Sequence, residues 1–196
     1  MSDRIDFLFP TPIFINTNLL NNVEYQKELI NKCYITKQNN ICSRTNWLTS
    51  VYNTIESNAI LKDNLFKDLI NKVGSKVKEF ALKHEANIKL KCKDGWMNIY
   101  SNKDYQESHI HGGAIFSCVY ILKAPLGSGK LVFFPRTKSS INLNPSIPNI
   151  LTDQLVSYDS IEDSLFIFQS DVPHMVSQGT NIDDRISIAF NFYKDN

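Results

Sequence analysis

The chain has 196 residues, of which 42% are hydrophobic and 11% aromatic. This is enough for one hydrophobic core, so we expect a single domain over residues 1–196. The net charge of +1 provides no general field for nucleic acid or an anionic membrane, and we expect neither as a partner. Four cysteines without a C-x-x-C pair, and an N-terminus with charges and prolines in place of an apolar signal, predict a cytoplasmic protein with reduced thiols. Nothing in the composition indicates an oligomeric state.

The first part of the chain, about residues 1–93, is predicted to be mainly helical. Asn21 or Asn22 is placed to cap a short first helix. The polar segment 50–60 is expected to be a connection. A longer helix is expected from about residue 58 to 84, where Gly74 could interrupt it. Its apolar stripe consists of Leu61, Leu65, Leu69, Val73, Val77, Phe80 and Ala81.

From about residue 94 to 196 the pattern changes to short segments rich in β-branched and aromatic residues, separated by turn-forming clusters. The predicted strands are 96–100, 115–122, 130–134, 155–158, 164–168 and 185–193. Helices followed by many short strands predict an α+β, mainly β fold, in which helices pack on one face of an antiparallel sandwich or barrel.

The last predicted strand has two different faces, because alternate residues of a strand point to opposite sides. One face carries Ile186, Ile188, Phe190 and Phe192, and suits a position under the helices. The other carries Arg185, Ser187, Ala189 and Asn191, and is typical of a polar cavity rather than of a surface exposed to water. The segment "WMNIY" repeats this pattern, with Trp96, Asn98 and Tyr100 on one face.

Three of the four histidines are candidates for one metal site. His109 and His111 are two residues apart, so on a strand they would point to the same side with Cβ atoms about 6–7 Å apart. His174 lies near another predicted strand end and is the credible third ligand, whereas His84 belongs to the helical part. A three-cornered set of imidazoles leaves open positions and suits iron with oxygen or a substrate. The alternative is a structural histidine pair on a wet surface.

Arg185 is the candidate anion-binding residue, because a guanidinium on a cavity face is costly without an anion. A small molecule with a carboxylate, held also by the Ser187 hydroxyl, would satisfy it. The alternative is an ion pair within the protein, with Asp171 or Asp159.

Five stretches carry a resemblance to a known family. They are "LFPTPIF", "WMNIY", "HIHGGAIFSCVYILKAP", "GSGKLVFFPR" and "SLFIFQSDVPHMVSQGTNIDDRISIAFNFY". The chain resembles the Fe(II)/2-oxoglutarate-dependent dioxygenases of the prolyl-hydroxylase-like branch, and within it a group of oxygenases from bacteria and phages. The last stretch is the most specific, because it contains the distal histidine, a short turn and then Arg-x-Ser.

The resemblance implies a double-stranded β-helix, or jelly roll, with an N-terminal helical layer packed on one sheet. It implies Fe(II) at His109, His111 and His174, and 2-oxoglutarate with its distal carboxylate on Arg185 and Ser187. Tyr100 or Asn98 would contact the cosubstrate or the substrate. The implied enzyme is a non-haem Fe(II) hydroxylase that couples oxidative decarboxylation of 2-oxoglutarate to hydroxylation of a small-molecule or peptidyl substrate. No catalytic residue is expected beyond the metal ligands.

Two positions depart from the broad family. His111 stands where that family has an aspartate or glutamate, and Ile121 stands where related enzymes often have a tyrosine. Two other functions therefore stay open: a cupin-like enzyme with three histidines that does not use 2-oxoglutarate, and a non-catalytic β-sandwich binding module. Substrate specificity is expected in the loops 35–50 and 136–154, of which the second is a candidate lid.

Overall fold

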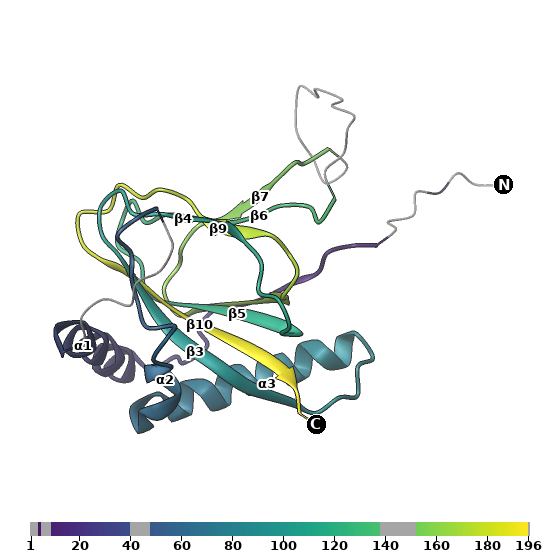
Figure 1. The fold of residues 1–196 in the computed structure, drawn as a ribbon, viewed down its shortest axis with the longest axis horizontal. Coiled ribbons are helices and arrows are strands. Elements are labelled where there is room, and N and C mark those ends of the chain that lie inside the picture. The colour runs from purple at the N-terminus through teal and green to yellow at the C-terminus, as the bar shows by residue number, and fades with distance from the viewer. Residues whose placement is uncertain (1–3, 5–8, 40–47, 138–151, 196) are drawn as a thin grey trace.

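The computed structural model describes residues 4, 9–39, 48–137 and 152–195. These residues form two antiparallel sheets and a layer of helices (Figure 1). The larger sheet has the strand order β1 (Ile13–Asn16), β8 (Ser164–Gln169), β5 (Phe116–Lys123), β10 (Arg185–Lys194), β3 (Leu90–Tyr100) and β2 (Tyr52–Asn53). The smaller sheet has the order β4 (Gln106–His109), β9 (His174–Val176), β6 (Leu131–Phe133) and β7 (Val156–Tyr158). This is the predicted double-stranded β-helix, with helices on one sheet.

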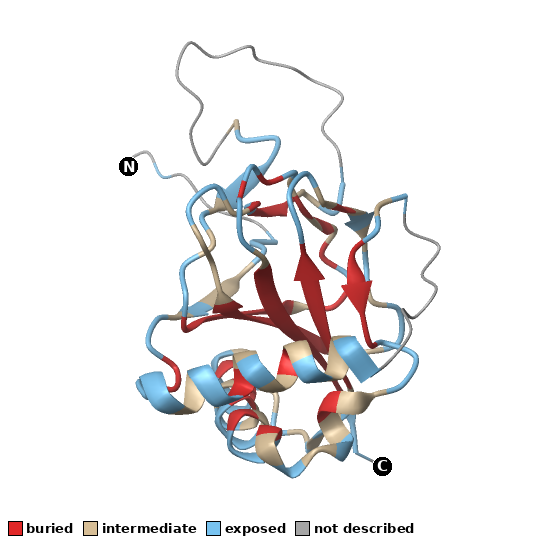
Figure 2. Cartoon of the chain, turned by 90° about the vertical axis from the view of Figure 1, so that its left-hand side faces the viewer, coloured by how far each residue is buried: buried red, intermediate tan, exposed pale blue. Residues whose placement is uncertain are grey.

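The helical layer lies against the larger sheet, on the side away from the smaller one (Figure 1). It consists of α1 (Val23–Asn39), α2 (Ala59–Lys62), the 3₁₀ turn η1 (Asn64–Phe66) and α3 (Lys67–Lys83). Figure 2 shows the buried central strands above helices that expose their outer faces. The buried stripe of α3, which includes Leu69, Val73 and Phe80, packs in one core with Ile188 and Phe190 of β10. Burial of each such side chain contributes about 1.5–3 kcal/mol.

The first helix begins at Val23 and is capped by Asn22, one of the two predicted capping residues, whose side-chain oxygen accepts a hydrogen bond from the backbone N–H of Tyr25 at 3.1 Å. The helix then continues for 17 residues and is longer than expected. None of the helices in the described part of the chain is long and apolar enough to span a membrane.

The prediction of one helix over residues 58–84 is wrong, because the chain breaks at Asp63. Asp63 has an extended backbone, and its side chain accepts a hydrogen bond from the backbone N–H of Leu65 at 2.9 Å. It also forms an ion pair of 2.7 Å with Lys32 of α1. A carboxylate that caps a new turn and holds a neighbouring helix competes with helix continuation. Gly74, where an interruption was considered possible, lies inside α3.

The prediction that residues 50–60 form only a connection is also wrong. Tyr52 and Asn53 form β2 at the edge of the larger sheet, and both are buried. Thr54 continues the contact with β3, because its backbone N–H donates to the carbonyl of Met97 and its hydroxyl accepts from the backbone N–H of Met97, each at 3.2 Å. A two-residue strand is too short to show an alternating pattern in the sequence.

The strand predictions for β5, β6, β7, β8 and β10 agree with the structure to within one residue at either end, whereas β3 begins six residues earlier than expected. Gly95 of β3 allows a close approach by the helical layer, because a Cβ atom there would lie 2.8 Å from Cδ2 of Leu61 and 3.3 Å from Cδ1 of Phe190. Most of the candidate lid, residues 138–151, lies outside the described residues, as do residues 40–47 of the other candidate loop.

Candidate metal centre

The three candidate histidines lie together at the paired ends of β4 and β9 in the smaller sheet. His109 is the last residue of β4 and is paired in register with His174, the first residue of β9. The ring centroids of His109 and His174 are 4.3 Å apart, and the ring centroid of His111 lies 5.0 Å from each of them. One ring nitrogen from each of the three imidazoles lies within 4.8 Å of the other two. One small ion could therefore contact all three side chains.

His111 reaches this position by a different route from the one predicted. Their spacing predicted that His109 and His111 lie on one strand, but β4 ends at His109. The backbone N–H of His111 donates to the carbonyl of Ser170 at 2.9 Å, so the turn after β4 is attached to the end of β8. As a result, Nε2 of His111 lies 3.2 Å from Nε2 of His174. The turn, and not strand alternation, brings His111 to the other imidazoles.

Two of the rings are oriented by backbone carbonyls. Nδ1 of His109 lies 2.7 Å from the carbonyl oxygen of Glu107, and Nδ1 of His174 lies 2.9 Å from that of Val172. A carbonyl can only accept, so each Nδ1 carries the proton and each Nε2 keeps the lone pair that binds metals. Outer hydrogen bonds of this kind are typical of histidine ligands.

The pKa values of the three imidazoles favour the neutral form. Burial lowers the pKa of His109 below its usual value, despite the Glu107 carbonyl, which raises it. Burial, followed by the neighbouring His109, lowers the pKa of His111 to about 4. Burial also lowers the pKa of His174 well below the usual range, and the other two histidines add to this effect. Neutral imidazoles are the form that binds a metal ion, so little free energy is lost to deprotonation.

A small cavity extends from the histidines into the space between the sheets. Its free volume is about 20 Å³, which is roughly the space of one water molecule. It is lined by Trp96, Asn98, Tyr100, Gln106, His109, His111, Val119, Leu131, His174, Val176, Ser187 and Ala189. The predicted cavity faces of β3 and β10 thus both line it. Gln106, which the sequence analysis did not single out, accepts a hydrogen bond from the Tyr100 hydroxyl at 2.8 Å and connects the two sheets.

Arg185 lies at the start of β10 with a fully buried side chain. Its Nε donates to the Ser160 hydroxyl at 2.9 Å, and its Nη1 donates to the Ser187 hydroxyl at 3.3 Å. The guanidinium carbon stands 4.8 Å from the ring centre of Tyr100. Ser160 was not predicted, because it belongs to a loop without a pattern. Burial lowers the pKa of Arg185, an effect that Tyr100 opposes.

The alternative role of Arg185, an ion pair with Asp171 or Asp159, is wrong. Asp171 pairs with Arg136 at 2.8 Å, and Asp159 pairs with Lys130 at 2.8 Å. Across the described ranges, no carboxylate oxygen lies within 4.0 Å of the Arg185 guanidinium. Its Nη2 is buried and has no hydrogen-bond partner. Oδ1 of Asn98 is likewise buried and without a partner. A buried cation with an unused donor is suited to an incoming anion.

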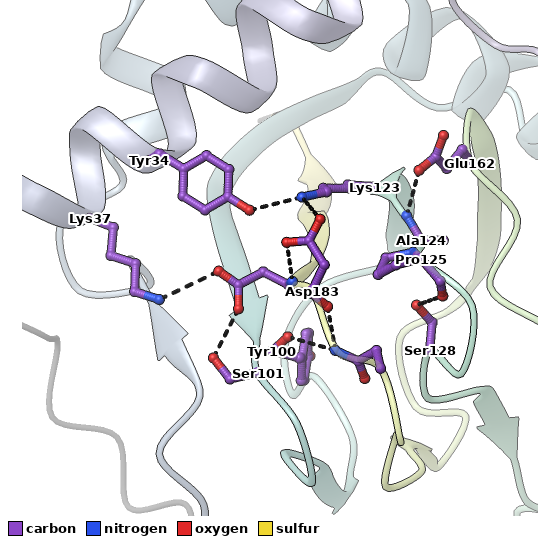
Figure 3. Close-up of polar contacts among 12 residues, drawn as sticks. Tyr34, Lys37, Tyr100, Ser101, Lys123, Ala124, Pro125, Ser128, Glu162 and Asp183 are labelled. Carbon is purple, nitrogen blue, oxygen red and sulfur yellow. Dashed lines mark hydrogen bonds and ion pairs between the residues drawn. The ribbon is translucent and has the colours of Figure 1, made fainter.

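A surface network holds the turn that precedes Arg185 (Figure 3). The ammonium of Lys123, from β5, contacts the carboxylate of Asp183 at 2.6 Å and donates to the hydroxyl of Tyr34 on α1 at 3.1 Å. Asp184, the next residue, accepts a hydrogen bond from Ser101 at 2.9 Å. The helical layer is therefore connected to the beginning of β10, where the arginine must be positioned.

A family model described as "Putative 2OG-Fe(II) oxygenase", where 2OG is 2-oxoglutarate, matches residues 94–191, which is 98 of the 196 residues. No curated protein matches the chain. Among solved structures, a prolyl-4-hydroxylase of Pseudomonas putida is similar with a TM-score of 0.68 and 12% identity, over 95% of this chain and 94% of that chain. A prolyl hydroxylase of Trichoplax adhaerens, in complex with a peptide fragment of hypoxia inducible factor, has a TM-score of 0.65 and 17% identity, over 93% and 83%.

A viral collagen prolyl hydroxylase of Paramecium bursaria Chlorella virus-1, in complex with 2-oxoglutarate, has a TM-score of 0.64 and 14% identity, over 94% of this chain and 96% of that chain. At these identities the structures show a shared fold. The family model covers the chain from within β3 to most of β10, including the three histidines, Arg185 and Ser187. On this match, the chain belongs to the 2OG-Fe(II) oxygenase family.

Proposed function

We propose that this protein is an Fe(II)- and 2-oxoglutarate-dependent hydroxylase. The observation that carries the proposal is the unpartnered buried guanidinium of Arg185, which lies beside the cavity that contains the three histidines. The donor set fits both groups. Neutral imidazoles suit a divalent iron, and a guanidinium with an unused N–H suits a carboxylate.

His109, His111 and His174 would hold the iron, and Arg185 would hold the distal carboxylate of 2-oxoglutarate with help from the Ser187 hydroxyl. When bound, the two cofactors supply the chemistry in which O₂ and 2-oxoglutarate are consumed, succinate and CO₂ are formed, and one oxygen atom enters the substrate. The contributions of the protein are to bind, to orient and to exclude water. Val119, Leu131, Val176 and Ala189 provide the apolar part of the wall that excludes it.

Tyr100 and Asn98 are the further candidates for contact with the cosubstrate or the substrate. 2-Oxoglutarate is much larger than the present cavity, so its binding requires lining side chains to move. The Tyr100–Gln106 hydrogen bond crosses from one sheet to the other at this point. We infer that it separates when the cosubstrate enters, which would free the Tyr100 hydroxyl and the Gln106 amide for new contacts.

The substrate that we propose is a small molecule or a peptidyl side chain. The similar structures include a prolyl hydroxylase in complex with a peptide fragment and a collagen prolyl hydroxylase, but their identities support only a common fold. A cytoplasmic location, and the absence of nucleic-acid and membrane partners, stay predictions from composition.

Anaerobic titration tests the proposal directly. Addition of Fe(II) and then 2-oxoglutarate to the metal-free protein is expected to produce a weak visible charge-transfer band that neither addition produces alone. A cupin-like enzyme without 2-oxoglutarate would bind iron and show no such band, and a non-catalytic module would bind neither. Succinate formation against a panel of amino acids, peptides and small metabolites would then identify the substrate class.

A further inference from the structure

His111 differs from the other two histidines in the group that stands behind it. His109 and His174 each direct Nδ1 to a backbone carbonyl. Nδ1 of His111 faces a side chain instead. Nδ2 of Asn191 lies 3.5 Å from it and can only donate, so in the metal-free protein the imidazole proton is on Nε2 and must leave that atom when a metal binds. Asn191 is buried on the cavity side of β10, with 5% of its surface exposed. The orientation of the third imidazole thus depends on a residue 80 positions away in the chain.

A carboxylate lies directly beyond this amide. Asp94 of β3 is paired in register with Asn191, and its Oδ2 accepts hydrogen bonds from Nδ2 of Asn191 at 3.4 Å and from the Tyr193 hydroxyl at 2.5 Å. The hydroxyl of Ser117 donates to the other end of the amide, Oδ1, at 2.8 Å. The amide is therefore held between a serine, an imidazole and a carboxylate.

The negative charge of Asp94 is not neutralised by an ion pair. Within the described ranges no lysine or arginine nitrogen lies within 4.0 Å of its carboxylate. The adjacent Lys93 places its ammonium over the ring of Tyr193, 5.5 Å from the ring centre. The carboxylate also acts on His111 through space, since it opposes the lowering of the pKa of that imidazole by burial and by His109.

This charge has a use at a metal centre built from histidines. Three neutral imidazoles bring no negative charge to a divalent cation, and in a partly dehydrated site the full charge of the ion is poorly screened. An anion just outside the ligands lowers the free energy of the bound ion, and it stabilises a trivalent ion more than a divalent one. Partners behind the ligands also fix the ring and its basicity.

We propose that Asp94 is the outer anion of the metal centre and acts on the bound ion through space. The inference rests on the proposed function in one respect, because it takes the three histidines as the metal ligands. The competing explanation is that Asp94, Asn191 and Tyr193 only join β3 to β10, in which case their substitution would change stability and leave the centre unaffected.

Zinc affinity of the metal-free protein, measured by competition with a chromophoric chelator, separates these explanations. Asp94→Asn keeps the shape of the side chain and an oxygen for Tyr193, but removes the charge. We expect it to weaken zinc binding about 10- to 100-fold, as substitutions behind metal ligands typically do.

Two control variants are matched to Asp94→Asn. Asp195→Asn removes the same charge from an exposed position next to β10, and Tyr193→Phe removes the hydrogen bond but keeps the anion. Both should bind zinc within about threefold of the wild type.

The exchange variant Asp94→Asn/Asn191→Asp gives a second test that does not depend on the stability of the single variant. It retains the charge and moves the carboxylate next to His111. We expect zinc affinity at least as high as in the wild type, whereas a loss of affinity caused only by disturbed packing would leave the exchange variant as weak as the single substitution or weaker. In the iron-loaded protein, Asp94→Asn should also shift the midpoint potential of the Fe(III)/Fe(II) couple to a more positive value.

The wild-type measurement distinguishes the two proposals. If the wild type does not bind zinc, the metal site of the proposed function is wrong, and the role of Asp94 is wrong with it. If the wild type binds zinc and Asp94→Asn binds it equally well, or the exchange variant remains as weak as the single one, the role of Asp94 alone is overturned.

Discussion

The two faces of β10 are buried to almost the same extent but have opposite chemistry. Toward the helices, Ile188 and Phe190 have no exposed surface and belong to the apolar core. Toward the smaller sheet, Arg185 has no exposed surface and Ser187 only 1%. Burial of the first face drives folding. Burial of the second opposes it, because polar groups leave water and Arg185 keeps an unused donor.

The difference shows where stability and function are separated in this protein. Adjacent residues of a strand point to opposite sides, so one strand can serve the core and the site at the same time. An unfavourable polar surface is retained in a folded protein where an activity requires it. Substitutions on the helix side should therefore change stability, and substitutions on the cavity side should change binding.

The largest effect on stability is expected for Phe190→Ala. The substitution leaves a cavity in the core beneath the helices and should lower the free energy of unfolding by about 3–5 kcal/mol. Urea unfolding, monitored by circular dichroism, measures this loss of unfolding free energy. Ala189→Ser, its neighbour on the cavity side, is the matched control and should lower the free energy by less than about 1 kcal/mol. Equal losses in the two variants would remove the distinction between the faces.

Arg185→Ala should produce the largest effect on binding. We expect the dissociation constant for 2-oxoglutarate to rise by more than about tenfold, which corresponds to about 1.4 kcal/mol. Arg185→Lys should restore little, because a point charge cannot replace the planar guanidinium. Calorimetry with a redox-inert divalent metal in place of iron measures both variants.

The same experiment tests the separation of roles within the cavity. Metal affinity should stay unchanged in Arg185→Ala, since the three imidazoles remain. The loss of unfolding free energy should be smaller than in Phe190→Ala, because the arginine is poorly satisfied in the folded protein. Unaltered 2-oxoglutarate affinity, or loss of metal binding together with the arginine, would show that its assigned role is wrong.

The histidines should make the stability of the metal-free protein depend on pH. The pKa of His111 is about 4 in the folded protein because of burial, whereas an unfolded histidine has a pKa of about 6.5. Between these values the unfolded chain binds more protons, so the free energy of unfolding should fall as the pH is lowered from about 6.5 to about 4. Urea unfolding with a chelator across this range should show a smaller slope in His111→Gln. Identical slopes would mean that His111 is not the buried, neutral group described above.

The smallest effect is expected at the surface network in Figure 3. Lys123→Met removes the ion pair with Asp183 and the hydrogen bond to Tyr34. Because the Asp183 side chain is 59% exposed, the pair should contribute less than about 1 kcal/mol to the free energy of unfolding. Its effect on 2-oxoglutarate affinity should be at most about twofold. A tenfold loss would show that the turn before β10 is essential for the position of Arg185.

Local patterns were sufficient for much of the fold. Alternation in residues 185–193 predicted both faces of β10, and the same pattern predicted the cavity face of β3 with Asn98 and Tyr100. Where the pattern was too short or absent, prediction failed. The two-residue strand β2 and the break at Asp63 depend on a backbone pairing with β3 and on an ion pair with Lys32. In the sequence, β3 is not adjacent to β2, and Lys32 is not adjacent to Asp63.

The sequence by itself determined the composition of the site: three histidines, an arginine and a serine with spacings that suit a metal and a carboxylate. Tertiary structure decided their arrangement. His111 lies beyond the end of β4, and only the attachment of its turn to Ser170 brings it to His174, 63 residues further along the chain. The partners Ser160, Gln106 and the Asp94–Asn191 pair likewise depend on strand register and loop position. A side chain's residue type is local information, whereas its neighbours across two sheets are set by the packing of the whole chain.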